Sequence, residues 1–538
     1  MPKNNQKISP ETFIQEMTDT VEPLNKKLCQ LYWQLATTGE ENAARELSET
    51  EKKLKLLFSN PDQFAQLKQW EQKGIKDPLV AQQIEILIKS YIPNQLDEKT
   101  ISDLVERQTE IENIFNNFRT ELDGKKITNN DIKDILKKEK NEETRKKAWE
   151  ASKQIAEEVS DKVLELTKRR NKAAQKLGFI NHFEMSLGLQ DLNSRWLLNL
   201  FYKLKQDTEE TFSQKIGDLH KKLANHYGTL PEKIRPWHYE DPFSQETPAQ
   251  GAFNLDPYIQ NQDIVKACRE FYQGIDLDIA DVLERSDLFE KKGKSQHAFC
   301  ICMDKKKDVR ILCNIRPNTY WSSTMLHELG HAAYSKNIDA ELPYFLRDEA
   351  HLLTTEAIAM LMERMLKHPE WLEKMMGVSK EEVQKIKPAL WNQLALDKLI
   401  MARWVMVVTN FEKALYTNPD QDLNGLWWKL VKEFQLISKP EGRDYPDWAA
   451  KIHISTIPIY YQNYLLGELF AAQIADTLEK EVLKKPLREV SFCNNPNVGK
   501  LLKERLFKMG SKWRWDKLVP HVTHRALDQQ SFVRQFCS

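Results

Sequence analysis

The sequence predicts a mainly α-helical protein with one short β-hairpin. Only 17 of its 538 residues are glycine, and Glu- and Lys-rich amphipathic stretches recur along the chain, for example at 22–38 and 43–59. Strand-like alternation of apolar and polar residues is clear only at 297–303 and 309–315, on either side of a charged turn. Because 41% of the residues are hydrophobic, a chain of this length can bury an extensive core, either as one helical unit or as two lobes.

The composition argues against several functional classes. Lys plus Arg and Asp plus Glu number 79 each, so no net field recruits nucleic acid or an anionic membrane. The N-terminal residues Met1–Gln6 lack the apolar stretch of a secretory leader, and no apolar run is long enough to cross a bilayer. We therefore expect a cytoplasmic protein with neither nucleic-acid nor membrane partners.

The seven cysteines do not suggest a disulfide framework, because their number is odd and they are scattered through a long chain. Cys300 and Cys302 are two residues apart on the first predicted strand and therefore share a face. No second cysteine pair follows that would complete a metal site. We interpret both residues as buried free thiols.

The strongest functional motif is the pentapeptide HELGH at 327–331. On a helix, His327 and His331 lie one turn apart and face the same way, which makes them half of a zinc site. Glu328 lies beside them, where a carboxylate can take a proton from water that a metal has made acidic. The flanking residues favour a helix, and Ser322 or Ser323 is expected to cap its N-terminus.

A catalytic zinc site needs a third protein ligand. The metzincin arrangement is excluded, because Asn337 stands where that class has its third histidine. Glu356 is the acid nearest the start of the apolar helix predicted downstream, and a carboxylate in such surroundings is costly unless it is paired or bound to metal. Glu349 and His351 are competing candidates, since both lie close by in the sequence.

These residues resemble the signature of the angiotensin-converting enzyme family of zinc peptidases, in which an HExxH helix is followed by a Glu-Ala-Ile run. The run matches Glu356-Ala357-Ile358 here. Further blocks resemble the family in the same order along the chain, so that the resemblance extends from about Leu24 onward. These blocks are Asp241–Gln245, Gln296–Cys300, Trp427–Leu430, Lys451–His453, and Pro458 with Tyr461 and Tyr464.

The resemblance implies a large two-lobed helical zincin (gluzincin) fold, with a deep central cleft and a small β-sheet beside the active site. It further implies a single peptidase domain over residues 1–538. Within this domain, helices in 10–120 would form a lid, 290–365 would hold the zinc-site core, and 427–470 would carry the substrate and oxyanion segment.

Catalytic roles follow from the same resemblance. It implies that His327, His331 and Glu356 hold one zinc ion per chain. Glu328 would act as general base and later as general acid, while Tyr464 and His453 would polarise the scissile carbonyl with the metal. A phenol and an imidazole can both donate a hydrogen bond to the oxyanion of the tetrahedral intermediate, which makes these roles chemically sound.

The implied substrates are short peptides with a free C-terminus. His297 and the backbone of Ala298 would align the peptide, and Gln245, Lys451 and Tyr461 would bind its terminal carboxylate. An amide, an ammonium and a phenol all donate to a carboxylate. The resemblance therefore predicts a peptidyl-dipeptidase, which releases C-terminal dipeptides. A relative that removes single residues has Arg in place of this Gln.

Two departures affect the substrate-binding segment. The interval from His453 to Tyr464 is one residue longer than in the family, so the tyrosine roles depend on an inserted residue near Pro458, with Tyr460 as the alternative. The family's chloride-binding arginines fall at Val431 and Asn463, so the resemblance does not carry chloride activation over to this chain.

A third departure concerns the metal site. The acid that the family has one turn after the third ligand is Met360 here. A hydrogen-bond partner for a ligand histidine must therefore come from elsewhere, and Glu363 is the candidate.

Two other functions fit the same motifs. An oligopeptidase of the thimet type shares the zinc helix, the downstream Glu and a Tyr-rich helix, but cleaves peptides internally. The second alternative is a catalytically inert protein that contains zinc and binds peptides in its cleft. The presence of Glu328 argues against the inert protein, because a protein without catalysis has no need of this base.

Overall fold

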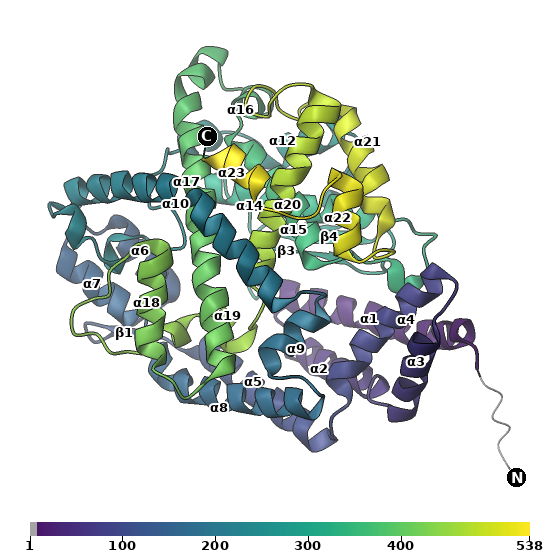
Figure 1. The fold of residues 1–538 in the computed structure, drawn as a ribbon. Helices are drawn as coiled ribbons and strands as arrows, with labels where there is room; N and C mark the ends of the chain where they lie inside the picture. The colour runs from purple at the N-terminus through teal and green to yellow at the C-terminus, as the bar shows by residue number, and fades with distance from the viewer. Residues whose placement is uncertain (1–7, 538) are drawn as a thin grey trace, which may run out of the picture. The chain divides into compact units, whose positions relative to one another are not determined.

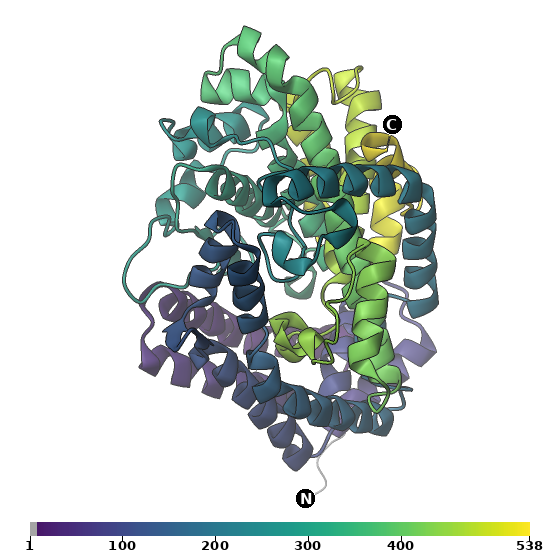
Figure 2. The same ribbon diagram turned by 90° about the vertical axis from the view of Figure 1, so that its left-hand side faces the viewer.

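The computed structural model describes residues 8–537, and it is mainly helical in this range (Figure 1). The same helical character is seen from a second side (Figure 2). The strands of the described range form two antiparallel hairpins. Residues 1–6, on which the predicted lack of a leader rests, lie outside the described part of the chain. No helix within 8–537 has both the length and the apolar character needed to span a bilayer.

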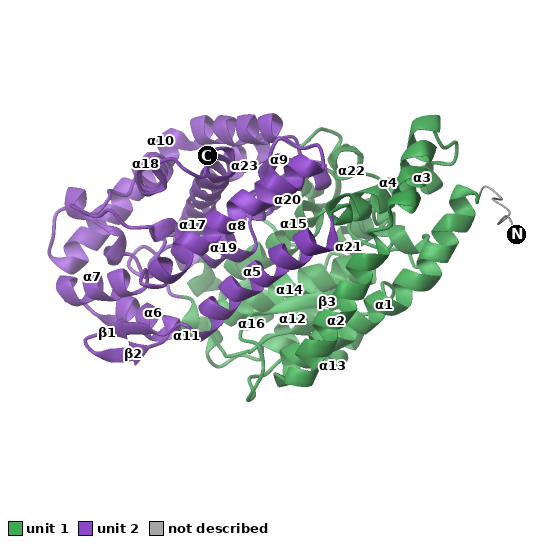
Figure 3. Cartoon of the chain, turned by 90° about the horizontal axis from the view of Figure 1, so that it is seen from below, with its two compact units in different colours: residues 1–96, 255–385, 470–527 green, residues 97–254, 386–469, 528–538 purple. Residues whose placement is uncertain are grey.

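The chain divides into two compact units, each built from three stretches of sequence (Figure 3). Unit 1 contains Met1–Leu96, Leu255–Lys385 and Phe470–Leu527, and unit 2 contains Asp97–Asn254, Ile386–Leu469 and Asp528–Ser538. The helices predicted to form a lid over 10–120 are shared between the units, because the fifth helix belongs to unit 2.

Unit 1 contains the α-helices α1 (Pro10–Thr38), α2 (Glu41–Leu57), α3 (Pro61–Lys73), α4 (Pro78–Tyr91), α11 (Asp256–Ile259), α12 (Ile264–Gly274), α13 (Ala280–Arg285), α14 (Thr319–Lys336), α15 (Leu352–Glu363), α16 (Pro369–Met376), α21 (Pro496–Arg505) and α22 (Trp515–Thr523). Its strands are β3 (Phe299–Cys302) and β4 (Val309–Leu312).

Unit 2 contains the α-helices α5 (Glu98–Asn117), α6 (Asn129–Lys138), α7 (Glu142–Ala151), α8 (Ile155–Lys176), α9 (His182–Leu189), α10 (Ser194–Tyr227), α18 (Leu423–Gln435), α19 (Ile452–Thr456) and α23 (Gln530–Phe536), and the strands β1 (Thr120–Leu122) and β2 (Lys125–Ile127). Two helices have residues in both units, α17 (Lys380–Thr417) and α20 (Gln462–Leu478).

The N-terminal helices of unit 1 begin at clear capping residues. The side chains of Ser9, Asn60 and Asp77 accept backbone N–H bonds at the starts of α1, α3 and α4, and each of these helices has proline at its first position. Their apolar faces then pack together into one core cluster. The cluster includes Phe13, Met17, Val21, Leu67, Trp70, Ile84, Leu87, Ile88 and Tyr91.

The hairpin predicted before the zinc helix is confirmed. β3 pairs with β4 in antiparallel register, with Phe299 opposite Leu312 and Cys302 opposite Val309. The first strand begins two residues later than predicted, so His297 is exposed in a bend before it. β3 packs against α14. Cys300 and Cys302 are free thiols, as predicted, although both are only partly buried.

The short β1–β2 hairpin in unit 2 is a feature that the sequence analysis missed. Its turn is Asp123-Gly124, and both residues have positive φ, 50° and 75°. An Asp-Gly pair is a strong signal for a two-residue hairpin turn, because both central residues of such a turn need the left-handed region. The flanking strands are only three residues each, too short to show alternation.

Candidate functional site

The zinc helix predicted from HELGH is α14, and it begins earlier than predicted. Asn318 caps it, because its side-chain oxygen accepts the backbone N–H of Trp321 at 2.9 Å. The prediction of Ser322 or Ser323 as the cap was wrong. The Ser322 hydroxyl lies inside the helix and donates to the Asn318 carbonyl at 2.9 Å. Asn is at least as good a cap as Ser, so the helix extends back to it.

Gly330, inside the HELGH motif, lets α14 approach α15 closely. A Cβ atom at this position would lie 2.7 Å from Ala359 Cα and 3.2 Å from the Ile358 carbonyl oxygen. Real Cβ atoms do not come as close to a backbone atom as the first of these distances, so only glycine fits here without a shift of one helix. The close contact brings Glu356, on α15, next to the two histidines on α14.

His327, His331 and Glu356 form the only group within residues 8–537 with the geometry of a three-ligand metal site. The two Nε2 atoms are 3.3 Å apart, and Glu356 Oε2 lies 3.6 Å from His327 Nε2 and 4.0 Å from His331 Nε2. The nearest point equidistant from three atoms with these separations lies about 2.1 Å from each, which is the bond length of zinc to imidazole nitrogen and carboxylate oxygen. The three side chains therefore fit zinc.

The environment of Glu356 also fits a cation. Its side chain is buried, and no residue in the described range donates a hydrogen bond to Oε2. Burial raises the pKa of Glu356 to about 7, although His327 acts in the opposite direction. A buried carboxylate oxygen without a donor is costly, and a metal ion at this position would remove that cost.

The other nitrogen of each ligand histidine is fixed by a hydrogen bond. His327 Nδ1 lies 3.1 Å from Glu363 Oε2, and His331 Nδ1 lies 2.6 Å from Thr355 Oγ1. These contacts leave both Nε2 atoms facing the proposed metal position, as in other histidine metal sites. The prediction that Glu363 partners a ligand histidine is confirmed. The role of Thr355 as the partner of His331 was not predicted, although Thr355 directly precedes the candidate ligand Glu356 in the sequence.

The two competing third ligands lie elsewhere. Glu349 accepts a hydrogen bond from the Ser335 hydroxyl at 2.6 Å, and His351 caps α15 through Nδ1, which accepts the Leu353 N–H at 3.0 Å. Neither belongs to the metal-ligand group of the described chain. Glu356 is the third ligand that this geometry supports.

Glu328, the predicted base, follows the first ligand histidine on α14 and is 8% exposed. Burial raises the pKa of Glu328, while His327 lowers it and Glu363 raises it further. A carboxylate with a raised pKa is a stronger base than one in water, which suits a group that accepts and returns a proton. The substrate-aligning residues predicted in the same unit, His297 and Ala298, directly precede β3.

The predicted residues of unit 2 form a second cluster. Lys451 Nζ donates to Gln245 Oε1 at 3.0 Å. The ammonium lies about equally far from three aromatic rings, with centroid distances of 5.3 Å to Phe243, 5.4 Å to Trp404 and 5.3 Å to Tyr461. The rings stabilise the cation through their faces. Lys451 is 8% exposed, and no carboxylate in the described range lies within 4.0 Å of it.

The loop that carries Gln245 is held from several sides. The carboxylate of Asp241 accepts the backbone N–H groups of Phe243, Gln245 and Glu246 at 2.9, 3.0 and 3.2 Å. Lys153 donates to the carbonyl of Pro242 at 2.8 Å. The amide of Gln435 donates to the next two carbonyls of the loop. These bonds fix the backbone that presents Gln245 to Lys451.

The tyrosines predicted to act in catalysis and binding pack together. The ring of Tyr461 lies 4.8 Å from that of His453 and 5.4 Å from that of Tyr464, and Tyr460 also lies 5.4 Å from Tyr464. Tyr461, rather than Tyr460, is the tyrosine found beside Lys451.

A buried polar network precedes these tyrosines, and the sequence analysis did not predict it. Ile459 has a φ of 60°, which is strained for a β-branched residue. Its N–H donates to Glu412 at 2.8 Å, and its carbonyl accepts from the amides of Gln190 and Gln462 at 3.2 and 2.7 Å. Asn463 also donates to Gln190, at 3.0 Å. The network holds the strained backbone that leads into the tyrosine segment.

Comparison with known proteins bears on the identity of the chain. The family model described as angiotensin-converting enzyme matches residues 4–253 and 241–537, which is nearly the whole sequence. No curated protein matches the chain in sequence. The helical fold with its two small hairpins and the candidate ligand set His327, His331 and Glu356 agree with this match. The chain therefore belongs to the angiotensin-converting enzyme family, has its mainly α-helical zincin fold, and is a metallopeptidase.

Proposed function

We propose that this protein is a zinc-dependent peptidyl-dipeptidase, which releases dipeptides from the free C-terminus of short peptides. His327, His331 and Glu356 would hold the zinc ion. When bound, zinc supplies Lewis-acid chemistry, because it polarises a carbonyl group and makes water more acidic.

The observation that carries the dipeptidase assignment is the ammonium of Lys451. A buried cation without a carboxylate partner is costly, and an anionic ligand would compensate its charge. One N–H of Lys451 is used by Gln245 Oε1, so the cluster offers the remaining ammonium N–H groups, the Gln245 amide N–H groups and the Tyr461 hydroxyl. A set composed of donors suits the terminal carboxylate of a peptide.

The proton transfers would be made by Glu328. Its carboxylate would accept a proton from the attacking water and then deliver it to the leaving amine, which becomes the N-terminus of the released dipeptide. The phenol of Tyr464 and the imidazole of His453 would donate hydrogen bonds to the oxyanion that forms on the scissile carbonyl. Donors of this kind contribute several kcal/mol when they are fixed in advance, typically about 3 kcal/mol each.

The assignment is tested with two peptides that differ only at the C-terminus. An N-terminally blocked tripeptide with a free carboxylate is compared with its amide, and kcat/KM for release of the dipeptide is measured. We expect the amide to be cleaved about 100-fold more slowly, because it loses the charge-assisted bonds to Lys451 and its partners. Equal rates for the two peptides would instead identify an enzyme that cleaves internally, as thimet-type oligopeptidases do.

A lysine variant makes the test specific. Lys451→Met should lower kcat/KM for the free acid by about 10- to 100-fold and leave the already slow amide unchanged. Lys432→Met, which removes an exposed lysine of α18 in the same unit, is the matched control and should change neither rate. A loss of the same size on both peptides in Lys451→Met would mean that Lys451 does not bind the carboxylate.

A variant of Glu328, the proposed base, distinguishes an enzyme from the inert peptide-binding protein. In Glu328→Gln, zinc should stay bound while turnover falls by orders of magnitude, because the amide cannot accept the proton. A wild-type protein that binds zinc and peptide but cleaves no more than Glu328→Gln would be a binding protein.

A further inference from the structure

Unit 2 contains a second buried lysine close to the terminal-carboxylate cluster, which is formed by Gln245, Lys451 and Tyr461. Lys153 lies between α7 and α8 and is 1% exposed, and its ammonium donates to the carbonyl of Pro242 at 2.8 Å. No carboxylate of the described chain lies within 4.0 Å of this ammonium. The proposed function gives this cation no role.

Lys153 and Lys451 approach the same aromatic ring. The Lys153 ammonium lies 3.4 Å from the centroid of the Phe243 ring, and the Lys451 ammonium lies 5.3 Å from it. The two nitrogen atoms are therefore at most about 9 Å apart. Charges at such a separation interact appreciably when they are buried, because they are screened less than exposed charges. A charge on Lys153 therefore acts on an anion bound by Lys451.

The charges around Lys153 do not balance. The nearby carboxylates are those of Asp447 and Asp241, and both are buried. Asp447 is bound by Arg443 at 2.6 Å, and Asp241 accepts three backbone N–H groups. The cations of the same group are Lys153, Lys451 and Arg443. When all five side chains are ionised, they carry one net positive charge, which a single peptide carboxylate would bring to zero.

We infer that Lys153 is a second cation of the terminal-carboxylate cluster and determines, together with Lys451, how strongly the protein prefers a free C-terminus over an amide. This inference rests on the proposed function, because it assumes that the cluster binds the terminal carboxylate of a peptide. The Pro242 carbonyl and the Phe243 ring cover the Lys153 ammonium. Lys153 therefore acts on the bound carboxylate through its electric field and not by direct contact.

The charge of Lys153 is lost near neutral pH. Burial lowers the pKa of its ammonium to about 7, although Asp447 opposes the shift. A peptide carboxylate bound at Lys451 would stabilise the charged form and raise this pKa. By linkage, the free acid binds more tightly when Lys153 is protonated, so its affinity falls as the pH rises through about 7.

The other ionisable groups near Lys153 do not obscure this dependence. Burial, and next the charge of Glu246, raise the pKa of Asp241 to about 6, so Asp241 is mostly ionised above pH 7. Burial and Asp241 raise the pKa of Tyr239, which stays neutral in the same range. Glu246 is exposed, and the Glu150 side chain is 41% exposed, so water screens both charges.

The test follows one ratio, that of kcat/KM for the N-terminally blocked tripeptide to kcat/KM for its amide, from about pH 6.5 to about pH 8.5. Groups that act on the chemical step, such as Glu328, affect both peptides alike and cancel from the ratio. In the wild type, the ratio should fall about 5-fold across this range, because Lys153 loses its charge. In Lys153→Met, it should start about 5-fold lower and stay constant within about twofold.

Three variants separate charge from packing. In Lys153→Met, the Pro242 carbonyl keeps its bond from Trp149 Nε1 at 3.0 Å, and the urea midpoint at pH 6.5 should be no lower than in the wild type, because a buried charge is removed. Lys153→Arg carries a charge that does not titrate, so the ratio should stay high throughout. Gln435→Met is the matched control. It removes two hydrogen bonds to the same loop but no charge, and should keep the pH step.

A wild-type ratio that does not change with pH, or an equal pH step in Lys153→Met, would overturn the inference and leave the proposed function intact. The second outcome would assign the step to another group, such as His453, whose ring packs on Tyr461. Loss of the step in Gln435→Met would also overturn the inference, because order in the loop would then carry the preference.

Equal cleavage of free acid and amide at every pH would instead refute the proposed function, and calorimetry then tests the inference separately. An N-acetylated dipeptide with a free carboxylate is titrated into the zinc-loaded protein at pH 7.5, in two buffers that differ in ionisation enthalpy. Uptake of about half a proton on binding to the wild type, and none in Lys153→Met, would support the inference. Binding without proton uptake in the wild type would contradict it.

Discussion

The two histidines of the candidate metal site show how single residues can tune such a site. Each imidazole has one nitrogen available for the metal and the other engaged by a neighbour, Glu363 for His327 and Thr355 for His331. Burial lowers the pKa of His331, so it stays in the neutral form that ligates metals. The orientation of the ring then depends on its second hydrogen bond.

Removal of that bond should weaken the site. In Thr355→Val, the shape of the side chain is kept but His331 Nδ1 loses its partner. We expect zinc affinity to fall about 10- to 100-fold, measured by competition with a chromophoric chelator. Thr354→Val is the control, because Thr354 is the preceding residue on α15 and bonds to the His351 carbonyl instead. Equal affinities in the two variants would show that Thr355 does not orient the ligand.

At the scale of the elements, the candidate metal site depends on how closely α14 and α15 approach. Gly330 permits the contact, and an alanine there would meet the backbone of Ala359. Helix propensity alone favours alanine over glycine by about 1 kcal/mol. Packing should outweigh propensity, because overpacking in a filled interior typically costs about 1–3 kcal/mol.

Gly330→Ala is therefore expected to lower the free energy of unfolding by up to about 2 kcal/mol and to weaken zinc binding, since α15 carries Glu356. Gly217→Ala in α10 is the matched control. A Cβ atom at Gly217 has no neighbour within 4 Å in the described chain, so that variant should be more stable than the wild type by about 0.5–1 kcal/mol. Urea unfolding and zinc titration measure both effects. A stabilised Gly330→Ala protein with unchanged zinc affinity would contradict this account.

A second prediction at this scale concerns how stability depends on pH, through Glu412, which accepts the backbone N–H of Ile459. Burial raises the pKa of Glu412 to about 8, against the lowering effects of the Ile459 N–H and Arg170. A Glu in the unfolded chain titrates near 4.3. The folded state therefore holds the proton more tightly, so the stabilisation is complete below about pH 4 and is lost as the pH rises through about 8.

Glu412→Gln cannot titrate, but its amide oxygen can still accept the Ile459 N–H. Between pH 5 and pH 8, the free energy of unfolding of the wild type should fall by roughly 2–4 kcal/mol relative to this variant. Urea midpoints at the two pH values measure the difference. Glu433→Gln, at an exposed position of α18, should follow the wild type. The same pH dependence in all three proteins would show that Glu412 ionises as it does in water.

At the scale of the whole molecule, the sequence predicted what depends on local spacing. The helical period places His327 and His331 on one face, and the alternation around the charged turn predicts the β3–β4 hairpin. The cap of α14 and the turn of β1–β2 also had local signals, in Asn318 and in Asp123-Gly124, but these were not used.

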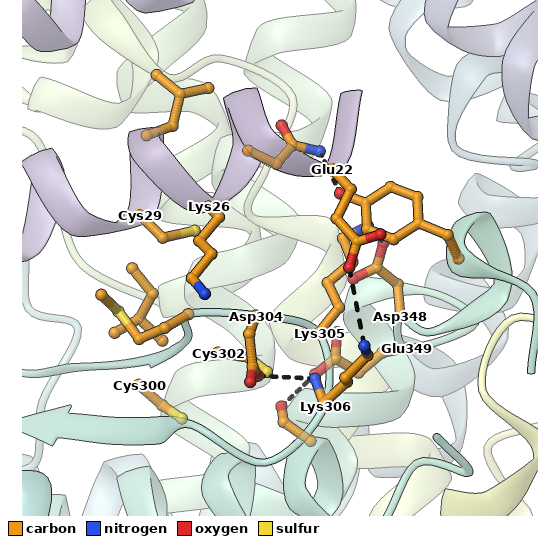
Figure 4. A pocket seen from close by; sticks show the side chains of 16 residues that line it. Glu22, Lys26, Cys29, Cys300, Cys302, Asp304, Lys305, Lys306, Asp348 and Glu349 are labelled. Atoms are coloured by element: carbon orange, nitrogen blue, oxygen red, sulfur yellow. Dashed lines mark hydrogen bonds and ion pairs between the residues drawn. The ribbon is translucent and has the colours of Figure 1, made fainter. Parts of the chain in front are cut away.

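Contacts between residues far apart in the sequence were harder to predict. Lys451 and Gln245 are 206 residues apart, and only the family resemblance suggested that they act together. The bonds of Gln190 to the segment around Ile459 had no signal in the sequence, because they depend on where the end of α9 meets that segment. The cavity beside β3 (Figure 4) could not be predicted either, because its lining residues come from four separate stretches of the chain, in α1, in β3 with the turn after it, in α14 and in the segment before α15.

The central claim is that His327, His331 and Glu356 hold one zinc ion on which peptide hydrolysis depends. The most direct test is to titrate the metal-free protein with zinc while hydrolysis of a blocked tripeptide is followed. We predict that activity rises in proportion to zinc up to one equivalent per chain, and that Glu356→Gln shows no such rise at the same concentrations. Hydrolysis by the metal-free protein, or a Glu356→Gln variant that regains full activity at one equivalent, would contradict the account.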